Sequence, residues 1–244
     1  MDYLGSGSIC TSMPACFSIV MPVLDEAPIV AAALAALEPL RGRGAELIVV
    51  DGGSRDGTAT AAAPWADQVV VVPRGRARQM NAGASRARGD VLLFLHADTA
   101  LPQGALDGVA AALLGDSRAG CEPPVWGRFD VEIRGRGRML KVVAAMMNLR
   151  SRVTGIATGD QAIFVTRAAF EAVGGFPDQL LMEDIELSKR LRRIGAPACL
   201  RETVVTSGRR WEVQGPWRTI FLMWRLRFLY FCGVAPERLA RSYR

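Results

Sequence analysis

The sequence predicts an α/β protein whose doubly wound, mostly parallel sheet carries helices on both faces. From Phe17 to Asp98, short runs of Val, Ile, Leu and Phe alternate with longer Ala-rich stretches that favour helix. This alternation is the pattern of βαβ units. The apolar runs are continuous, as in strands buried on both faces, and this favours parallel pairing.

The first half contains four expected strands separated by three expected helices. The strands occupy 17–23, 46–52, 68–73 and 90–98. The helices occupy 26–40, 58–66 and 76–88, each bounded by Pro or Gly. Right-handed crossovers then bring these strands into one sheet.

After Gly115 the regular alternation of short apolar runs and Ala-rich stretches ends. The expected strands are 125–133 and 161–166, and the expected helices are 138–150 and 182–195, the second ending at Gly195. Their apolar residues are Leu140, Val143, Ala144 and Met147 in the first helix and Ile185, Leu187, Leu191 and Ile194 in the second. Because no repeat or linker intervenes, we expect 15–212 to form one domain with a continuous sheet. Residues 1–14 are then an N-terminal extension and 213–244 a C-terminal, amphipathic helical extension.

The composition limits the environment and the partners. Lys and Arg number 30 against 24 Asp and Glu, and only Lys141 and Lys189 are lysines. Arginine suits bidentate contact with phosphate, although the codon usage of a GC-rich genome would also explain its excess. The five cysteines are far apart and form no C-x-x-C pair, so we expect neither disulfides nor structural zinc, and a reducing cytoplasm. The N-terminal residues lack the pattern of a secretory signal.

Ligands of such sheets bind beyond the carboxyl ends of the strands. The loops there are PVLDE (22–26), DGGSRDGT (51–58), RGRAR (74–78) and HADT (96–99). PVLDE, DGGSRDGT and HADT contain acids, and RGRAR contains three arginines. Carboxylates brought together repel one another unless a cation or hydrogen-bond donors intervene. A nucleotide diphosphate with a divalent ion is the simplest ligand that uses both signs of charge. The glycine-rich segment 51–58 would also serve as an ordinary turn and helix cap.

The motifs, taken in order, resemble those of family 2 glycosyltransferases of the GT-A fold. They are SIVMPVLDE, LIVVDGGSRDGT, NAGASRARGDVLLFLHADT, GDQAIF and MEDIELSKRL, and the resemblance runs from about Phe17 to Trp211. It implies transfer of a hexose from a nucleoside-diphosphate sugar to an acceptor hydroxyl. It also implies inversion and a Mn²⁺ or Mg²⁺ ion on the diphosphate. We expect a UDP-linked donor in preference to a GDP-linked one. No G-x-G-x-x-G follows the first strand, which argues against a dinucleotide-binding domain.

The resemblance also assigns donor and metal residues. The nucleotide-binding residues are Pro22, Leu24, Glu26, Asp51, Gly53, Arg76 and Arg78, with Arg74 beside them. The metal ligand is Asp98, and His96 stands where the family usually has the first acid of Asp-x-Asp. Imidazole favours Mn²⁺ over Mg²⁺. Alternatively, His96 only packs or hydrogen-bonds at the end of the strand, and Asp98 alone binds the metal. A separate alternative is that Asp98 only caps a helix ahead of Pro102.

The catalytic base implied by the resemblance is Asp184. The acceptor and donor-sugar residues are Gly159, Asp160, Gln161, Glu183, Arg210 and Trp211. Without the resemblance, Glu183 and Asp184 would complement a helix dipole, and 159–161 would be a turn before a strand.

The segment 217–231 is rich in aromatic residues and Leu, interrupted by Arg218, Arg225 and Arg227. It is too short and too charged to span a bilayer. One interpretation is an interfacial helix, which would make the protein peripheral at the inner face of the membrane and would suit a lipid acceptor. The other is a helix that packs against the catalytic domain or against a second copy in a homodimer.

Two rival functions remain at this stage. A sugar-phosphate nucleotidyltransferase would have a Gly-rich, basic loop after the first strand, and PVLDE is not such a loop. A non-enzymatic protein that binds anionic lipid would explain the positive charge but would not need Asp98 or Asp184. Nucleic acid is not an expected partner, because aromatic and basic residues do not interleave outside the tail.

Overall fold

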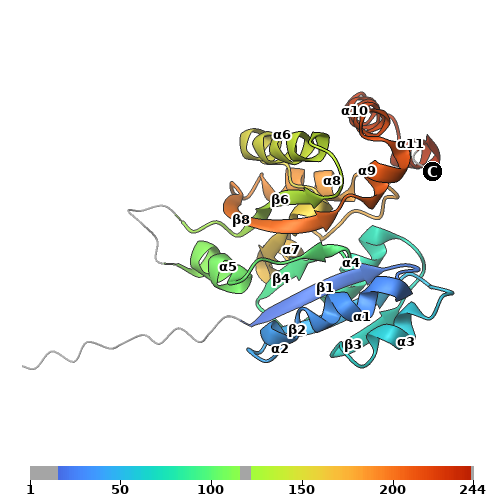
Figure 1. The fold of residues 1–244 in the computed structure, drawn as a ribbon. Helices are drawn as coiled ribbons and strands as arrows, with labels where there is room; N and C mark the ends of the chain where they lie inside the picture. Colours follow the sequence, from blue (N-terminus) through green and yellow to red (C-terminus); the bar gives the residue numbers. More distant parts are fainter. Residues whose placement is uncertain (1–15, 116–121, 243–244) are drawn as a thin grey trace, which may run out of the picture.

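The computed structural model describes residues 16–115 and 122–242, apart from the side chain of Arg210 (Figure 1). The strands are β1 (Phe17–Val23), β2 (Glu46–Asp51), β3 (Gln68–Val71), β4 (Val91–Phe94), β5 (Thr99–Ala100), β6 (Trp126–Arg134), β7 (Phe164–Thr166) and β8 (Ala198–Ser207). They form one eight-stranded sheet in the order β3-β2-β1-β4-β7-β6-β8-β5. The expected continuation of the sheet into the second half is confirmed. The expected extension 1–14 lies outside the described residues.

The helices cover both faces of this sheet (Figure 1). They are α1 (Ala27–Ala35), α2 (Glu38–Arg41), α3 (Thr58–Ala62), α4 (Arg76–Arg86), α5 (Ala105–Leu114), α6 (Met139–Thr154), α7 (Arg167–Ala172), α8 (Glu183–Leu191), α9 (Arg209–Gln214), α10 (Pro216–Phe231) and α11 (Pro236–Ser242). β1, β2, β3 and β4 pair in parallel, whereas β7 is antiparallel to both β4 and β6. The predicted α/β class with a mostly parallel, doubly wound sheet is confirmed.

Two hydrophobic cores lie on opposite faces of the sheet. Alternate residues of β1 divide between them: Ile19 packs in the core that includes α1 and α5, and Val20 in the core that includes α4 and α8. Both side chains are at most 1% exposed. Burial on both faces explains why the strands read as continuous apolar runs.

The sheet curls, and the curl positions the residues that follow β4. Few residues separate β4 from β5, yet β5 pairs with β8, on the far side of β7 and β6. The amide of Phe94 donates to the carbonyl of Ile163 at 2.9 Å, and Thr99 Oγ1 lies 3.0 Å from Thr206 Oγ1. The segment 95–98 is therefore held at both ends.

Several sequence expectations need correction. The strand expected over 161–166 begins only at Phe164, because 159–161 form a 3₁₀ helix (η2, Gly159–Gln161) closed by a capping box between Thr158 and Gln161. The single helix expected over 26–40 is divided into α1 and α2. The reason is that Pro39 has no N–H to continue the ladder. The expectations did not include α5 or β8.

The contact between α4 and the sheet generates a prediction about stability. A Cβ atom at Gly83 would overlap Val20 Cγ1 and lie 3.0 Å from Val50 Cγ2. Gly83→Ala should therefore lower the free energy of unfolding by about 1–3 kcal/mol through overpacking. Gly108→Ala in α5 is the control, since its Cβ would meet only the exposed carboxylate of Glu202 and the side chain of Leu200. It should raise stability by about 0.5–1 kcal/mol. Urea denaturation of both variants checks the pair, and equal effects would contradict it.

Candidate active site

Asp51 ends β2 at the carboxyl edge of the sheet and is 2% exposed. Its Oδ1 accepts hydrogen bonds from Gly53 N (2.9 Å), Ser54 N (2.8 Å) and Ser54 Oγ (2.7 Å). Gly53 has φ 87°, a conformation that glycine adopts without strain. The segment 51–58 thus forms the turn that its sequence predicts, and the turn fixes the Asp51 carboxylate in place.

The loops after β1 and β2 hold one another. Asp25 N donates to Ser54 Oγ at 2.9 Å, and Arg55 N donates back to Asp25 Oδ1 at 3.0 Å. Glu26 N donates to Thr58 Oγ1 at 2.8 Å. These crossed bonds fix the backbone around Glu26 relative to the Asp51 turn.

Gln79 in α4 joins the ends of the same two strands. Its side chain is buried, and Nε2 donates to the carbonyls of Val23 and Val50, both at 2.8 Å. Gly52 leaves room for it, because a Cβ there would lie 3.1 Å from the Gln79 side chain. Gln79 was not among the site residues expected from the sequence. Its only signal is a Gln among the small and apolar residues of the inward face of α4.

His96 and Asp98 lie between β4 and β5, at the same edge as Asp51. The side chain of His96 is 14% exposed, and its Nδ1 lies 3.5 Å from Asp160 Oδ1. Its ring lies against Gly159, where a Cβ would be 2.6 Å from His96 Cε1. Within the described residues, no group of three or more His, Cys, Asp or Glu side chains could hold a metal by itself. This donor set fits an ion that a diphosphate also ligates, because the phosphate oxygens would complete the shell.

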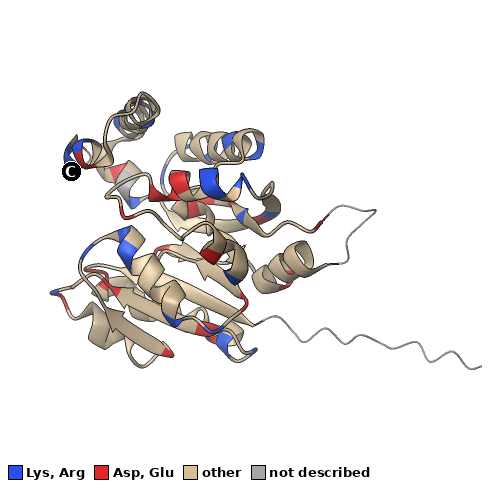
Figure 2. Ribbon diagram, turned by 180° about the vertical axis from the view of Figure 1, so that it is seen from behind, with Lys and Arg blue, Asp and Glu red and all other residues tan. Residues whose placement is uncertain are grey.

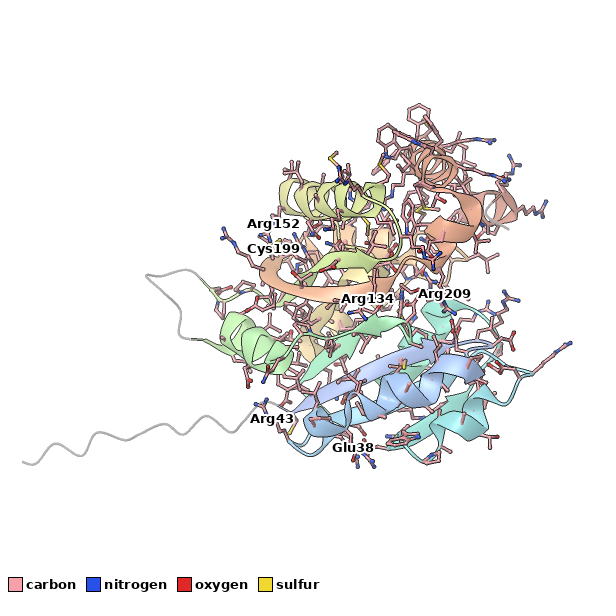
Figure 3. The ribbon with its side chains drawn as sticks, in the orientation of Figure 1. Glu38, Arg43, Arg134, Arg152, Cys199 and Arg209 are labelled. Atoms are coloured by element: carbon pink, nitrogen blue, oxygen red, sulfur yellow. The ribbon has the colours of Figure 1, made fainter. Side chains whose placement is uncertain are left out.

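The pKa of Glu26 is affected by the charged side chains at this edge of the sheet. Burial raises its pKa, the opposing charge of Arg209 lowers it, and the carboxylates of Asp98 and Asp56 raise it further. Arg209 Nη2 lies 3.8 Å from Glu26 Oε2 (Arg209 is labelled in Figure 3). The structure therefore brings Glu26 and Asp98 into one electrostatic neighbourhood with a neighbouring arginine.

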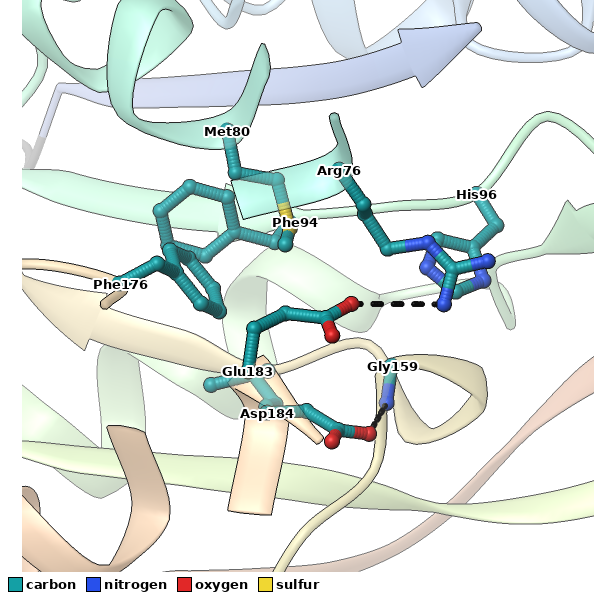
Figure 4. Close-up of a pocket in the computed structure, with 9 residues that line it drawn as sticks. Arg76, Met80, Phe94, His96, Gly159, Phe176, Glu183 and Asp184 are labelled. Atoms are coloured by element: carbon teal, nitrogen blue, oxygen red, sulfur yellow. Dashed lines mark hydrogen bonds and ion pairs between the residues drawn. The ribbon is translucent and has the colours of Figure 1, made fainter. Parts of the chain in front are cut away.

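A pocket beside this segment contains five of the predicted site residues (Figure 4). Its polar lining is Arg76, His96, Gly159, Glu183 and Asp184, and its apolar lining is Met80, Phe94, Ile163 and Phe176. Residues from α4, the β4–β5 segment, η2 and α8 converge here, although they are far apart in the sequence.

Asp184 occupies the first turn of α8 with its carboxylate at the pocket. Oδ2 accepts a hydrogen bond from Gly159 N at 3.0 Å, and Oδ1 accepts one from Ile185 N at 2.8 Å. The side chain is partly exposed to the pocket, but protein surrounds it. Burial and the adjacent Glu183 charge raise its pKa to about 6, against the opposing effects of the two amides and Arg76. Asp184 is therefore a carboxylate with unusual basicity.

The two predicted donor arginines of α4 make different contacts. Arg76 Nη1 lies 3.5 Å from Glu183 Oε1, whose side chain is 5% exposed (Figure 4). Arg78 makes a bidentate ion pair with Asp178, at 2.8 Å from Nε and 2.9 Å from Nη2. Only Arg76 belongs to the pocket.

Gln161 and Trp211 do not line this pocket. Gln161 is buried, and its Nε2 donates to Ser151 Oγ at 3.0 Å. Trp211 lines a separate hollow beside Arg136 and Arg138. The side chain of Arg210 lies outside the described residues. In the structure Gln161 stabilises the turn that presents Gly159.

Arg150 of α6 is a second residue that the sequence analysis missed. Its Nε and Nη2 are inaccessible and have no hydrogen-bond partner among the described residues. Burial lowers its pKa, while Asp184 and Asp160 act in the opposite direction. A buried, incompletely paired guanidinium is costly to the folded state. No single-sequence signal distinguishes it from the many other arginines of the chain.

The fold and the site together define the class of protein. A curled GT-A sheet with acids at its carboxyl edge and a basic carboxylate in a neighbouring pocket is the framework of a glycosyltransferase domain. The family model described as Glycosyl transferase family 2 matches residues 18–170, and the chain belongs to this family. A comparison with curated proteins found no match.

Three solved structures of similar fold belong to proteins whose names describe a sugar-transferring enzyme or a glycoside synthase. The mannosyltransferase PcManGT from Pyrobaculum calidifontis, in complex with GDP-Man and Mn²⁺, is 25% identical over 80% of this chain, with a TM-score of 0.57. This chain spans 57% of that protein's length. Glucosyl-3-phosphoglycerate synthase from Mycobacterium tuberculosis, in complex with Mn²⁺, UDP and glucosyl-3-phosphoglycerate, is 20% identical (78% and 70% of the two chains, TM-score 0.53). Mannosyl-3-phosphoglycerate synthase from Rubrobacter xylanophilus is 21% identical (87% and 74%, TM-score 0.52).

The incomplete pairing of Arg150 generates a prediction about stability. Arg150→Met keeps most of the side-chain volume and removes the buried charge, so the free energy of unfolding should rise by about 1 kcal/mol. Arg152→Met is the matched control, because Arg152 is bound to Asp130 and lies near the Cys199 carbonyl (Figure 3). That variant should be destabilised. Thermal unfolding of both proteins tests the difference, and a comparable loss in each would show that Arg150 is already satisfied.

Proposed function

We propose that this chain transfers a sugar from a UDP-sugar to an acceptor hydroxyl with inversion. The observation that supports this most directly is Asp184. Its pKa of about 6 leaves it ionised at neutral pH yet able to take a proton. It lies in a pocket with Arg76 and Glu183, next to the acids at the end of the sheet. The pairing of a base with a site for a charged donor is what a glycosyl transfer requires.

In the proposed reaction Asp184 acts as the base. Its carboxylate takes the proton of the acceptor hydroxyl while that oxygen forms a bond to the anomeric carbon of the donor. The bond from this carbon to the diphosphate oxygen breaks on the opposite face, and its electron pair leaves with the nucleoside diphosphate. The amides of Gly159 and Ile185 hold the carboxylate and so fix the direction from which the proton is taken.

The donor would lie along the carboxyl edge. In this proposal Asp51 contacts the base, and Pro22, Leu24, Glu26 and Gly53 surround the nucleoside. Asp98, with His96 beside it, would hold Mn²⁺ or Mg²⁺ on the diphosphate. When bound, the ion would offset the negative charge that develops on the leaving group.

Arg150 supplies a further electrostatic element of the proposed site. Its guanidinium is near enough to Asp184 and Asp160 for their charges to affect its pKa, and two of its nitrogens have no partner among the described residues. We infer that its positive charge acts on these two carboxylates through space, because the two unpartnered nitrogens are inaccessible to a substrate.

The proposal predicts how activity depends on Asp184 and on pH. Asp184→Asn should lower kcat by about 10²–10⁴-fold, because a general base contributes that much, and should leave nucleotide binding nearly intact. In the unaltered enzyme kcat/KM should fall as the pH drops through about 6, since protonated Asp184 cannot accept a proton. Glu171→Gln, at an exposed acid of α7, is the control. Full turnover by Asp184→Asn would remove the assignment.

The donor and the metal can be tested without an acceptor. In calorimetric titrations UDP should bind more tightly than GDP, and Mn²⁺ should strengthen the binding. Asp98→Ala should abolish the effect of Mn²⁺, and His96→Ala should reduce it. Asp107→Ala should behave like the unaltered protein. Asp107 is an exposed acid of α5 that pairs with Arg43, away from the proposed donor site. Equal affinity with and without metal would refute the metal assignment, and tighter binding of GDP would refute the UDP preference.

A further inference from the structure

One face of α10 is lined with exposed aromatic side chains. Along the helix they are spaced by four, three, four and three residues, which keeps them on one stripe of an α-helix. The members, 61–67% exposed, are Trp217, Phe221, Trp224, Phe228 and Phe231. We call them the aromatic stripe. Scattered exposed apolar residues are normal, but a contiguous row of five large aromatic side chains marks an interaction surface.

The opposite face of α10 fixes the orientation of the stripe. Leu226 is 1% exposed and packs in a cluster with Met182 and Ile185 at the start of α8. Tyr230 donates its hydroxyl to Glu186 Oε2 at 3.2 Å, and the ammonium of Lys189 lies 4.7 Å from the Tyr230 ring centre. The aromatic stripe therefore faces away from the catalytic domain.

A second exposed apolar row lies on α6, with the same helical spacing. Its members are Val142, Met146, Leu149 and Val153, 53–77% exposed. The two helices are neighbours, because Ile220 of α10 packs against the cluster that contains Leu140 and Val143 of α6. Figures 1 and 2 both place α6 and α10 at the same end of the molecule.

The charges beside these rows are all positive. Arg218, Arg225 and Arg227 flank the aromatic stripe, and Lys141 accompanies the row on α6. In Figure 2 the coloured positions on α6 and α10 are blue. No Asp or Glu occurs between Ile133 and Gly159 or between Val213 and Pro236. The combination of Trp and Phe with flanking arginines is that of a helix lying in the headgroup region of a bilayer.

An open hollow of about 990 Å³, solvent space included, lies at the start of α6, beside α9 and the first residue of α10. Arg136, Arg138, Trp211 and Pro216 line it. Glu212 is the one acid of its lining, and its Oε1 accepts a hydrogen bond from Arg136 N at 2.6 Å. The hollow is large enough for a phosphate headgroup, and its arginines have the charge that such a group needs.

We propose that the face formed by α6, α10 and this hollow seats on an anionic lipid bilayer. A second copy of the chain is a poorer occupant, because a symmetric contact would bring the stripe onto itself and the arginines of α10 against their own copies, with no acid on either helix to pair with them. Anionic headgroups supply that complementary charge. Among residues 16–115 and 122–242, no helix combines the length and the hydropathy that a membrane span needs.

Flotation with lipid vesicles tests the proposal independently of any transfer activity. The full chain should float with vesicles of phosphatidylcholine and phosphatidylglycerol in a ratio of roughly 7:3, whose anionic headgroups give the surface a negative potential. It should float much less with vesicles of phosphatidylcholine alone. The double variant Trp217→Ser, Trp224→Ser should weaken partitioning onto the vesicles at least about tenfold, since it removes two large apolar side chains that the bilayer would bury. The triple variant Arg218→Gln, Arg225→Gln, Arg227→Gln should lose the preference for the anionic vesicles.

Matched control variants distinguish binding by this face from non-specific binding of exposed apolar or basic residues to the vesicles. Val71→Ser with Leu114→Ser removes two exposed apolar residues elsewhere, and Arg86→Gln, Arg193→Gln, Arg201→Gln removes three exposed arginines elsewhere. Both should float like the unaltered chain, and circular dichroism checks the fold of each variant. The proposal is overturned if the unaltered chain stays at the bottom of the gradient or if the double Trp variant still floats. It is equally overturned if sedimentation shows a dimer that this variant dissociates while no vesicle binding occurs.

Discussion

The structure depends on keeping several carboxylates together at the carboxyl edge of one sheet. Asp51 is stabilised by three donors of its own turn, and Glu183 faces Arg76. Asp184 is stabilised less completely. Two backbone amides favour its charge, but burial and the neighbouring Glu183 outweigh them, and its pKa rises to about 6. Burial, with the neighbouring charge of Glu183 as the second cause, therefore gives Asp184 the basicity that the proposed proton transfer at neutral pH needs.

The parts of the fold that the sequence predicts are those whose burial is uniform. β1, β2 and β4 are buried on both faces and read as apolar runs, and their parallel arrangement puts their loops at one edge. β8 was not expected from the sequence because Arg201 and Glu202 are exposed within it. These two residues interrupt both a continuous apolar run and an alternation of apolar and polar residues. Gln79 was missed for another reason. Its partners, the carbonyls of Val23 and Val50, are distant in the sequence, so nothing local marks it as buried. The position of Trp211 likewise depends on its packing against α6.

The helix α8 links the proposed base to the outer surface of the molecule. Its first turn carries Asp184 at the pocket, and Ile185, the next residue, packs against Leu226 of α10. Glu186 is tied to Tyr230 of the same outer helix. The pocket and the aromatic stripe are thus attached to opposite sides of one short helix. A membrane that holds α10 would also hold the pocket at a fixed height above its surface, which suits an acceptor carried by a lipid.

The curl of the sheet has a consequence for how the protein matures. The residues that would hold the ion lie on a short bridge whose far end, at Thr99, is fastened to Thr206, 107 positions later in the chain. During synthesis the first four strands can associate long before that fastening exists. We expect His96 and Asp98 to reach their final places only after β8 has paired with β5, because the entropy of closing so long a loop must first be overcome. A nascent chain would accordingly form the sheet of β1, β2, β3 and β4 before the segment with His96 and Asp98 is in place.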